Sequence, residues 1–253
     1  SQRELTNDRL VLEILEIYEQ HTDKGYRRIR DDLNRRYGEH VSDKRVLRLM
    51  RKEQIQSTIK HPRNCCTRSA SKPQYIAENI LARDFHAERP NEKWVTDVTE
   101  FKFYDGQDTR KLYLSAILDL FDRRIVSYVI RNRNDNELVL GTLDKALRDN
   151  PDAHPLLHSD RGFQYTSHSF HVRIQKHGMI HSMSRVGHCI DNGPMEGFWG
   201  ILKREMYYRH IYESRNDLVN ALEGYLHYYN FERLQRRLSI MTPQEYHNHY
   251  LAA

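Results

Sequence analysis

Three apolar runs follow one another in the middle of the chain, WVTDVTEF (94–101), KLYLSAILDLF (111–121) and RIVSYVI (124–130). The first alternates, the second is almost continuously apolar and the third is rich in β-branched residues, as is typical of half-buried and fully buried strands. Asp105–Gly106 and Asp122–Arg123 supply turn residues between the runs. These patterns predict three consecutive strands joined by short turns.

Helical and strand patterns alternate further along the chain. Three strands followed by this alternation indicate a mixed α/β domain. The expected elements are a helix over 136–149, the strand PLLHS (155–159), a helix over 167–177, a strand over 179–183, a mobile loop SRVGHCID (184–191) and a helix that runs to about residue 208.

Three acidic residues occupy positions that a fold of this kind could bring together. Asp97 lies inside the first strand, Asp160 directly follows PLLHS, and Glu196 lies on the helix NGPMEGFWGILKRE (192–205). Ligand sites in open α/β sheets lie beyond the carboxyl ends of strands. Gathered carboxylates suit a hard cation such as Mg²⁺, and such sites cut and join phosphodiesters. Taken singly, each acid is more often a surface carboxylate or a helix cap.

Polar residues on the same helix extend this hypothesis. Lys203 lies two turns after Glu196 on the same helical face, where a cation could meet a phosphate, and Arg204 follows it. Asn192 precedes Glu196 by one turn and could orient the glutamate or contact DNA. Trp199 is expected to be core rather than a platform for stacking bases.

Three further side chains each allow two interpretations. His158 shares a strand face with Asp160, so it could contact a ligand or be a packed, hydrogen-bonded histidine. Asp119 ends the second strand and could be a fourth acid near the metal or the cap of the next turn. His181 lies four residues after His177 across Gly178, and both histidines are expected at the surface rather than as ligands.

The positive charge is concentrated at the N-terminal end. The chain of 253 residues has a net charge of +5, with 40 Lys/Arg and 35 Asp/Glu, yet residues 1–75 hold 17 basic and 11 acidic residues. Within 24–72 the numbers are 15 and 5. Such a segment indicates a polyanionic partner, most simply nucleic acid, or else a solvated basic face.

The same segment has the pattern of three short helices. They are expected over 3–21, from Tyr26 to near Gly38, and over 43–54, where Ser42 is a suitable N-cap. A basic third helix favours a helix-turn-helix module that enters the DNA major groove, although small three-helix domains also bind proteins. The candidate DNA contacts are Lys44, Arg45, Arg48, Arg51 and Lys52.

The remaining segments set the domain boundaries and exclude several classes. A polar, basic linker is predicted over 56–90, and an apolar stripe with a Thr242-Pro243 helix start predicts a helical extension over 209–253. No apolar stretch reaches the 18 residues of a membrane span. Cys65 and Cys66 are adjacent, and the three cysteines in all indicate reduced thiols in a cytoplasmic protein.

The quoted strings resemble the insertion-sequence transposases of the copy-out, paste-in kind, which share their core with retroviral integrases. GYRRIRDDLNRRYGEHVSDKRVLRLMRKEQI (25–55) resembles the helix-turn-helix of that family. The blocks PNEKWVTDVTEFKF, LYLSAILDLFDRRIVSY, HSDRGFQYTS, NGPMEGFWGILKRE and YNFERLQRRLSIMTPQEY resemble its core and C-terminal tail. The resemblance implies an all-α helix-turn-helix domain over 1–55, an RNase-H-like mixed-sheet core over 91–208, and a metal-binding triad of Asp97, Asp160 and Glu196.

This resemblance also implies a reaction. Two Mg²⁺ ions about 3.5–4 Å apart, with Mn²⁺ as a substitute, would flank a phosphodiester of a terminal inverted repeat, first for cleavage and then for strand transfer. No zinc is expected, because the His/His/Cys/Cys module of retroviral integrases is missing. At least a dimer on DNA, in the bacterial nucleoid, is implied. A DNA-binding regulator with an inactive core and a metal-dependent nuclease that does not join DNA remain alternatives.

Overall fold

The structure, a computed structural model, describes residues 2–59 and 73–252. The chain forms two compact units. One contains Ser1–Pro62 and Arg233–Thr242, and the other contains Arg63–Glu232 and Pro243–Ala253. The smaller unit therefore combines the N-terminal helices with a short segment that the sequence grouped with the C-terminal extension.

The smaller unit contains the three predicted helices, α1 (Gln2–Gln20), α2 (Tyr26–Arg36) and α3 (Asp43–Lys52). The Ser42 side chain accepts a hydrogen bond from the Arg45 backbone N–H and caps α3, as its sequence predicts. The apolar faces of the three helices meet in one core, formed by Leu10, Ile14, Ile17, Ile29, Leu33, Val41, Val46, Leu49 and Met50.

A mixed five-stranded sheet forms the centre of the larger unit, in the order β3-β2-β1-β4-β5. The first three strands form an antiparallel meander, whereas β4 and β5 run parallel to β1. This arrangement confirms the three consecutive strands that the sequence predicts. The strands are β1 (Lys93–Asp105), β2 (Asp108–Asp119), β3 (Ile125–Arg131), β4 (Leu156–Ser159) and β5 (Ile180–Met183).

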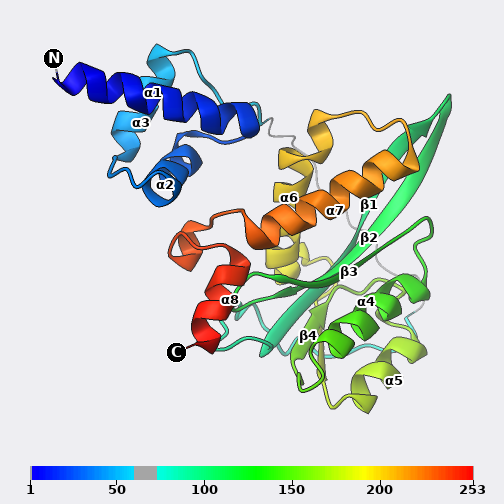
Figure 1. Ribbon diagram of the computed structural model, residues 1–253. Coiled ribbons are helices and arrows are strands. Elements are labelled where there is room, and N and C mark those ends of the chain that lie inside the picture. Colours follow the sequence, from blue (N-terminus) through cyan, green and yellow to red (C-terminus); the bar gives the residue numbers. More distant parts are fainter. Residues whose placement is uncertain (1, 60–72, 253) are drawn as a thin grey trace. The chain divides into compact units, whose positions relative to one another are not determined.

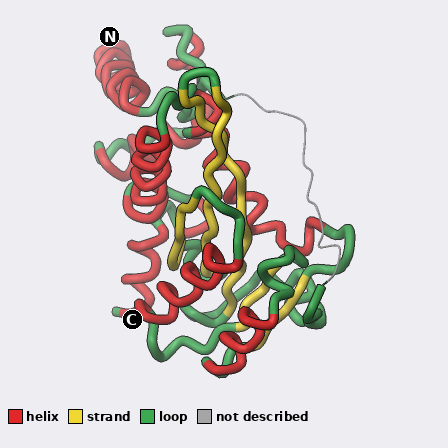
Figure 2. The backbone as a smooth tube through the Cα atoms, turned by 90° about the vertical axis from the view of Figure 1, so that its right-hand side faces the viewer, coloured by secondary structure: helices red, strands yellow, loops and turns green. Residues whose placement is uncertain are grey.

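Helices cover both faces of this sheet (Figures 1 and 2). On one face, α4 (Asn136–Asp149) and α5 (His168–Lys176) pack with Trp94, Leu143 and Phe170 in one apolar cluster. On the other face, α6 (Gly193–Glu205) and α7 (Arg215–Phe231) pack in a second cluster. The other elements are α8 (Pro243–Leu251) and the 3-10 turns Cys189–Asn192, Tyr207–Arg209 and Arg236–Leu238.

Part of the predicted linker packs on the sheet unit. Ala77, Leu81 and Ala87 are buried, and the Leu81 N–H donates to Ser182 Oγ over 2.9 Å. Residues 60–72 of that linker, with Cys65 and Cys66, lie outside the described residues. None of the described helices has the length and apolar character of a membrane span.

Candidate active site

Asp97 lies in the middle of β1, opposite Ala116 of β2. Side chains alternate along a strand, so Asp97 shares a face with Val95 and Phe101, which pack in the apolar cluster that includes α6. The Trp199 indole on α6 donates from Nε1 to Asp97 Oδ2 over 3.0 Å. Asp97 therefore points to the helix that carries Glu196, as the strand alternation predicts.

Asp160 directly follows β4, whose parallel neighbour is β1. The Gly162 N–H donates to Asp160 Oδ1 over 2.8 Å and so fixes the carboxylate at the start of the loop. A Cβ added at Gly162 would lie 3.0 Å from Asp160 Oδ1 and 2.9 Å from Gln164 Oε1. Glycine is thus the residue that lets the backbone approach the carboxylate this closely.

Glu196 lies in the first turn of α6 and is partly exposed. The loop before this helix is anchored by Asp191, whose fully buried carboxylate accepts from Arg185 Nη2 over 2.8 Å and from Arg83 Nε over 2.6 Å. Asn192 Nδ2 donates to the Thr96 carbonyl over 3.1 Å. The start of α6 is therefore tied to β1 beside Asp97.

The charges of Asp160 and Glu196 both act on the Asp97 carboxyl group. Burial, then the Asp160 charge and to a smaller extent Glu196, raises the pKa of Asp97 well above its usual range, against hydrogen bonds from Val98 and Trp199. Burial also raises the pKa of Asp160, opposed by the Gly162 N–H. Clustered carboxylates in a low dielectric repel one another, so a bound cation would favour their ionised forms.

The donor set fits a hard divalent cation in its chemistry, because all three side chains offer carboxylate oxygens. The buried Asn192 Oδ1 makes no hydrogen bond to any described residue, and the Nδ2 of the same amide bonds to Thr96, the neighbour of Asp97. Within residues 2–59 and 73–252, however, no three acidic, histidine or cysteine side chains already form a metal-binding group. The charges of Asp160 and Glu196 act on Asp97, but the three side chains do not form a ready metal-binding group, and their role as a metal triad stays a prediction.

The two basic residues of α6 lie in different surroundings. Lys203 Nζ lies 5.4 Å from the centre of the Phe101 ring, and the Arg204 guanidinium folds back over Gly200. Asn192 is only 4 % exposed. Its amide orients α6, whereas a contact of Asn192, Lys203 or Arg204 with DNA stays a prediction.

The structure decides between the two interpretations of His158. The ring is fully buried, with Nδ1 2.9 Å from Ser182 Oγ and Nε2 3.1 Å from Ser184 Oγ. Burial lowers the pKa of His158 to about 4, so the ring is neutral. His158 is therefore the packed, hydrogen-bonded histidine of the two alternatives.

His181 is also buried, with 7 % of its surface exposed, so its predicted surface position is wrong. The predicted boundary at Gly178 is confirmed, since α5 ends at Lys176 and Gly178 adopts a φ of +62°. The ring of His181 lies inward because β5 places residue 181 on the face that packs against Phe170.

Of the two interpretations of Asp119, the structure supports the cap of the next turn. Its carboxylate is fully buried and accepts hydrogen bonds from the Phe121 N–H over 2.8 Å and the Asn91 N–H over 2.6 Å. Trp94 Nε1 donates to Asp119 Oδ2 over 3.2 Å. These donors account for the carboxylate without a metal.

The basic residues of α3 divide into two groups. Lys44, Arg48 and Arg51 are exposed and have no hydrogen bond or ion pair to the described part of the chain. Arg45 donates to Asn7 Oδ1 from Nη2 over 2.9 Å, and Lys52 lies 3.9 Å from Glu53. Three of the five candidate DNA contacts therefore have guanidinium or ammonium groups open to solvent.

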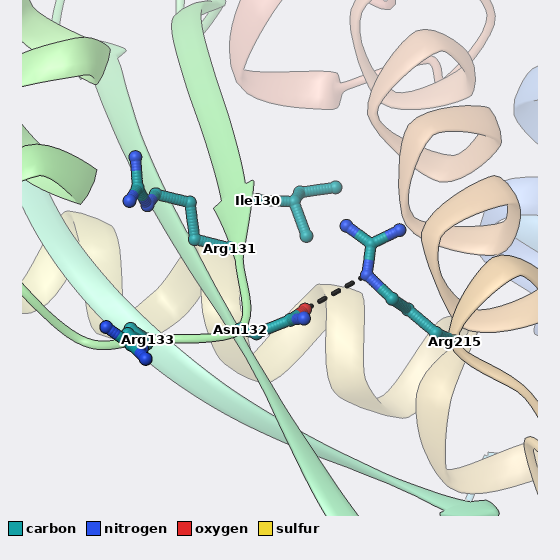
Figure 3. Close-up of a pocket in the computed structure, with 5 residues that line it drawn as sticks. All are labelled: Ile130, Arg131, Asn132, Arg133 and Arg215. Atoms are coloured by element: carbon teal, nitrogen blue, oxygen red, sulfur yellow. Dashed lines mark hydrogen bonds between the residues drawn. The ribbon is translucent and has the colours of Figure 1, made fainter.

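A pocket of about 330 Å³ lies at the carboxyl end of β3. Arg215 Nε donates to Asn132 Oδ1 over 3.0 Å across it, while Arg131 and Arg133 point to the other side of the strand (Figure 3). Arg131 is paired with Glu137 over 2.6 Å. The cationic groups thus do not converge on one ligand position.

Two features of the site were missed by sequence reasoning. Trp199 lies three residues after Glu196, so helical spacing could have placed both on one face, but nothing identified Asp97 as the partner of the indole. Asp191 carried no signal for its contacts with Arg83 and Arg185, because Arg83 lies more than 100 residues away in sequence.

Comparisons with known proteins place these observations in context. Family models described as integrase core domain match residues 87–189 and 196–251, and a model described as HTH-like domain matches residues 6–63. The putative transposase InsK for insertion sequence element IS150 of Escherichia coli K12 is 41% identical over 237 residues, which cover 93% of this chain and 81% of that protein.

Two further comparisons agree with this match. An uncharacterized 31 kDa protein of insertion element IS600 from Shigella sonnei is 32% identical and covers 99% of this chain and 91% of its own length. The catalytic core of HTLV-2 integrase, solved in complex with magnesium, aligns with a TM-score of 0.51 at 20% identity, over 64% of this chain and 99% of that one. This likeness shows the integrase, RNase-H-like fold.

Proposed function

We propose, because this chain belongs to the insertion-element transposases with an integrase core, that it acts at both chemical steps of transposition. It binds the terminal inverted repeats of its element, cleaves one strand to free a 3′-OH, and joins that 3′-OH to target DNA. Both steps exchange one phosphodiester for another bond at phosphorus, so one set of carboxylates can serve both.

The observation that supports this proposal most is the effect of the Asp160 and Glu196 charges on Asp97. They come from a strand, the end of a parallel strand and a helix, yet Asp160 and Glu196 both raise the pKa of Asp97. Carboxylates that repel one another cost stability, and strongly perturbed pKa values cluster at functional sites. The same three residues are those that the family resemblance implies.

In this proposal the three carboxylates hold Mg²⁺, or Mn²⁺ as a substitute. The bound ions would supply activation of the attacking oxygen and stabilisation of the leaving 3′ oxygen. Asp97 on β1 and Asp160 directly after β4 provide fixed oxygen donors, because hydrogen bonds from Trp199 and Gly162 hold them. Glu196 completes the set from α6. Lys203, two turns along the same helix, faces a phosphate of the bound DNA.

The N-terminal helix-turn-helix provides the recognition of the inverted repeat. Lys44, Arg48 and Arg51 lie exposed on α3 without protein partners among the described residues, as phosphate and base contacts require. Because two element ends must be processed, we propose at least a dimer on DNA. The protein then works on the bacterial nucleoid, in the cytoplasm.

One assay tests this function. Purified protein is incubated with labelled inverted-repeat DNA, a supercoiled target and Mg²⁺ or Mn²⁺. Joined products are expected from the wild-type chain, and neither cleavage nor joining from Asp160→Asn or Glu196→Gln. Both substitutions keep the shape of the side chain and remove its charge, and their DNA binding should be unchanged.

The alternatives give different outcomes in the same assay. Cleavage without joined products would indicate a nuclease, and binding without cleavage would indicate a regulator with an inactive core. Full cleavage by Glu196→Gln would remove that residue from the site.

A further inference from the structure

One hydrogen bond connects a buried aromatic side chain directly to the proposed active site. Trp199 Nε1 donates to Asp97 Oδ2 over 3.0 Å. The indole is 6 % exposed and packs against Phe198, with ring centres 5.0 Å apart, so its position is fixed by the core. An indole N–H is a donor only, so it suits a carboxylate oxygen, which is an acceptor.

A second hydrogen bond ties the residue directly before α6 to β1. Asn192 Nδ2 donates to the Thr96 carbonyl over 3.1 Å, one turn before Glu196, while Trp199 lies just under one turn after it. The two bonds end on adjacent residues of β1, Thr96 and Asp97. Helix α6 is therefore fastened to β1 on both sides of Glu196.

We propose that Trp199 is a positioning residue for the active site, a role that rests on the proposed function. Its N–H holds Asp97 Oδ2 in place, and the same contact sets the spacing between Asp97 and Glu196. Groups that orient metal ligands commonly change metal affinity or activity by about 10–100-fold when they are removed.

The structure contains a matched control for this role. Trp94 also donates its indole N–H to a buried carboxylate, Asp119 Oδ2, over 3.2 Å. Asp119 is held by backbone N–H groups and belongs to a turn. Trp94→Phe therefore removes the same kind of bond outside the acidic trio. The chain has two tryptophans, so each can be followed alone.

The first measurement is the Mg²⁺ dependence of single-turnover cleavage of inverted-repeat DNA. Trp199→Phe keeps most of the packing and removes the donor. We expect it to lower the rate at subsaturating Mg²⁺ by about 10-fold or more, with the loss partly recovered at high Mg²⁺. Trp94→Phe should keep the wild-type Mg²⁺ dependence. Equal Mg²⁺ dependence of Trp199→Phe and Trp94→Phe, with Trp199→Phe folded, would overturn the proposal.

The second measurement does not depend on catalytic activity, and it uses the Trp199 variant only to assign a resonance. In ¹⁵N-labelled protein, the two indole N–H resonances are assigned with Trp94→Phe and Trp199→Phe. Asp97→Asn should shift the Trp199 resonance and leave that of Trp94 in place, and an unmoved Trp199 resonance would overturn the bond. If the resonance moves but the wild-type chain cleaves no DNA, the positioning contact stands and the proposed function fails.

Discussion

Arg236 and Asp31, which are 205 residues apart in the sequence, form a bidentate ion pair. Arg236 Nε lies 2.8 Å from Asp31 Oδ2, and Nη2 lies 3.0 Å from Oδ1. The same guanidinium reaches Asp43 Oδ1 over 2.8 Å at the first residue of α3. These bonds raise the pKa of the Arg236 guanidinium, with Asp31 as the largest cause. The segment 233–242 is thus bonded to the helices that are proposed to bind DNA.

Arg236→Ala should destabilise the smaller unit by roughly 1–3 kcal/mol, because it leaves the buried Asp31 carboxylate without this partner. Asp31 is 3 % exposed, whereas Arg236 is a surface residue and its pairing is partly screened. Hydrogen exchange of the amides of α2 and α3 in the full chain measures the effect. Arg237→Ala is the control, because Arg237 is exposed and has no such partners among the described residues. Equal protection in both variants would contradict the prediction.

Two arginines of the third helix, Arg45 and Arg48, should behave differently. Arg48→Ala is expected to weaken binding to inverted-repeat DNA and to lower the salt slope by about 1, because it removes an exposed guanidinium that has no partner among the described residues. Arg45→Ala should instead lower thermal stability, because Arg45 donates to Asn7 on α1. Affinity is measured at several salt concentrations and unfolding by circular dichroism. An unchanged salt slope for Arg48→Ala would argue against α3 as the recognition helix.

His181 should make stability fall at mildly acidic pH. Burial, with smaller effects from His158 and His171, lowers its pKa to about 4 from the usual 6.5. Between about pH 6.5 and pH 4, His181 is therefore protonated in the unfolded chain and neutral in the folded chain. Stability is lost as pH falls through about 6.5, and the loss levels off near pH 4. At pH 5 this histidine costs about 2 kcal/mol relative to neutral pH.

The check is the urea midpoint at pH 7 and pH 5 for the wild-type chain, His181→Asn and His249→Asn. His181→Asn should show a smaller drop between the two values. His249 is exposed, so its replacement should leave the drop as it is. A wild-type drop retained in His181→Asn would show that other groups cause it.

Local patterns predicted much of this fold, and the reason is physical. The alternation around Asp97 and the apolar run before Asp119 report burial directly, so the strands and the face of Asp97 followed from them. His181 and Asp191 were misjudged or missed because polar side chains are buried only where distant partners satisfy them. Ser159 is the hydrogen-bond partner of His181, and Arg83 is the ion-pair partner of Asp191. The place of Arg236 beside Asp31 has no local signal either.

Asp191 should matter more for catalysis than its distance from the reaction suggests. Its carboxylate joins Arg83 and Arg185 and also accepts from Asn79 Nδ2 over 3.1 Å, one residue before the Asn192 bond to β1. The two arginines hold the pKa of Asp191 well below its usual range, with Arg185 the largest cause. The stability that this carboxylate contributes is therefore present above about pH 4 and is lost only in stronger acid.

Asp191→Asn keeps the size of the side chain and removes the charge that holds the loop 184–191. We expect a loss of roughly 2–4 kcal/mol in unfolding free energy, since two arginines lose a buried partner, and a drop in cleavage rate that exceeds the loss of folded protein. The reason is that Glu196 lies in the first turn of α6, the helix that follows this loop. Limited proteolysis should cut the variant within 184–191 while leaving the helices of the smaller unit intact. Arg83→Lys is the milder companion variant, because it leaves the ion pair of Asp191 with Arg185 in place.

If Asp191→Asn cleaved DNA at the wild-type rate per folded molecule, the role of Asp191 would be structural alone. The position of Glu196 would then depend on the bonds of Asn192 and Trp199 to β1.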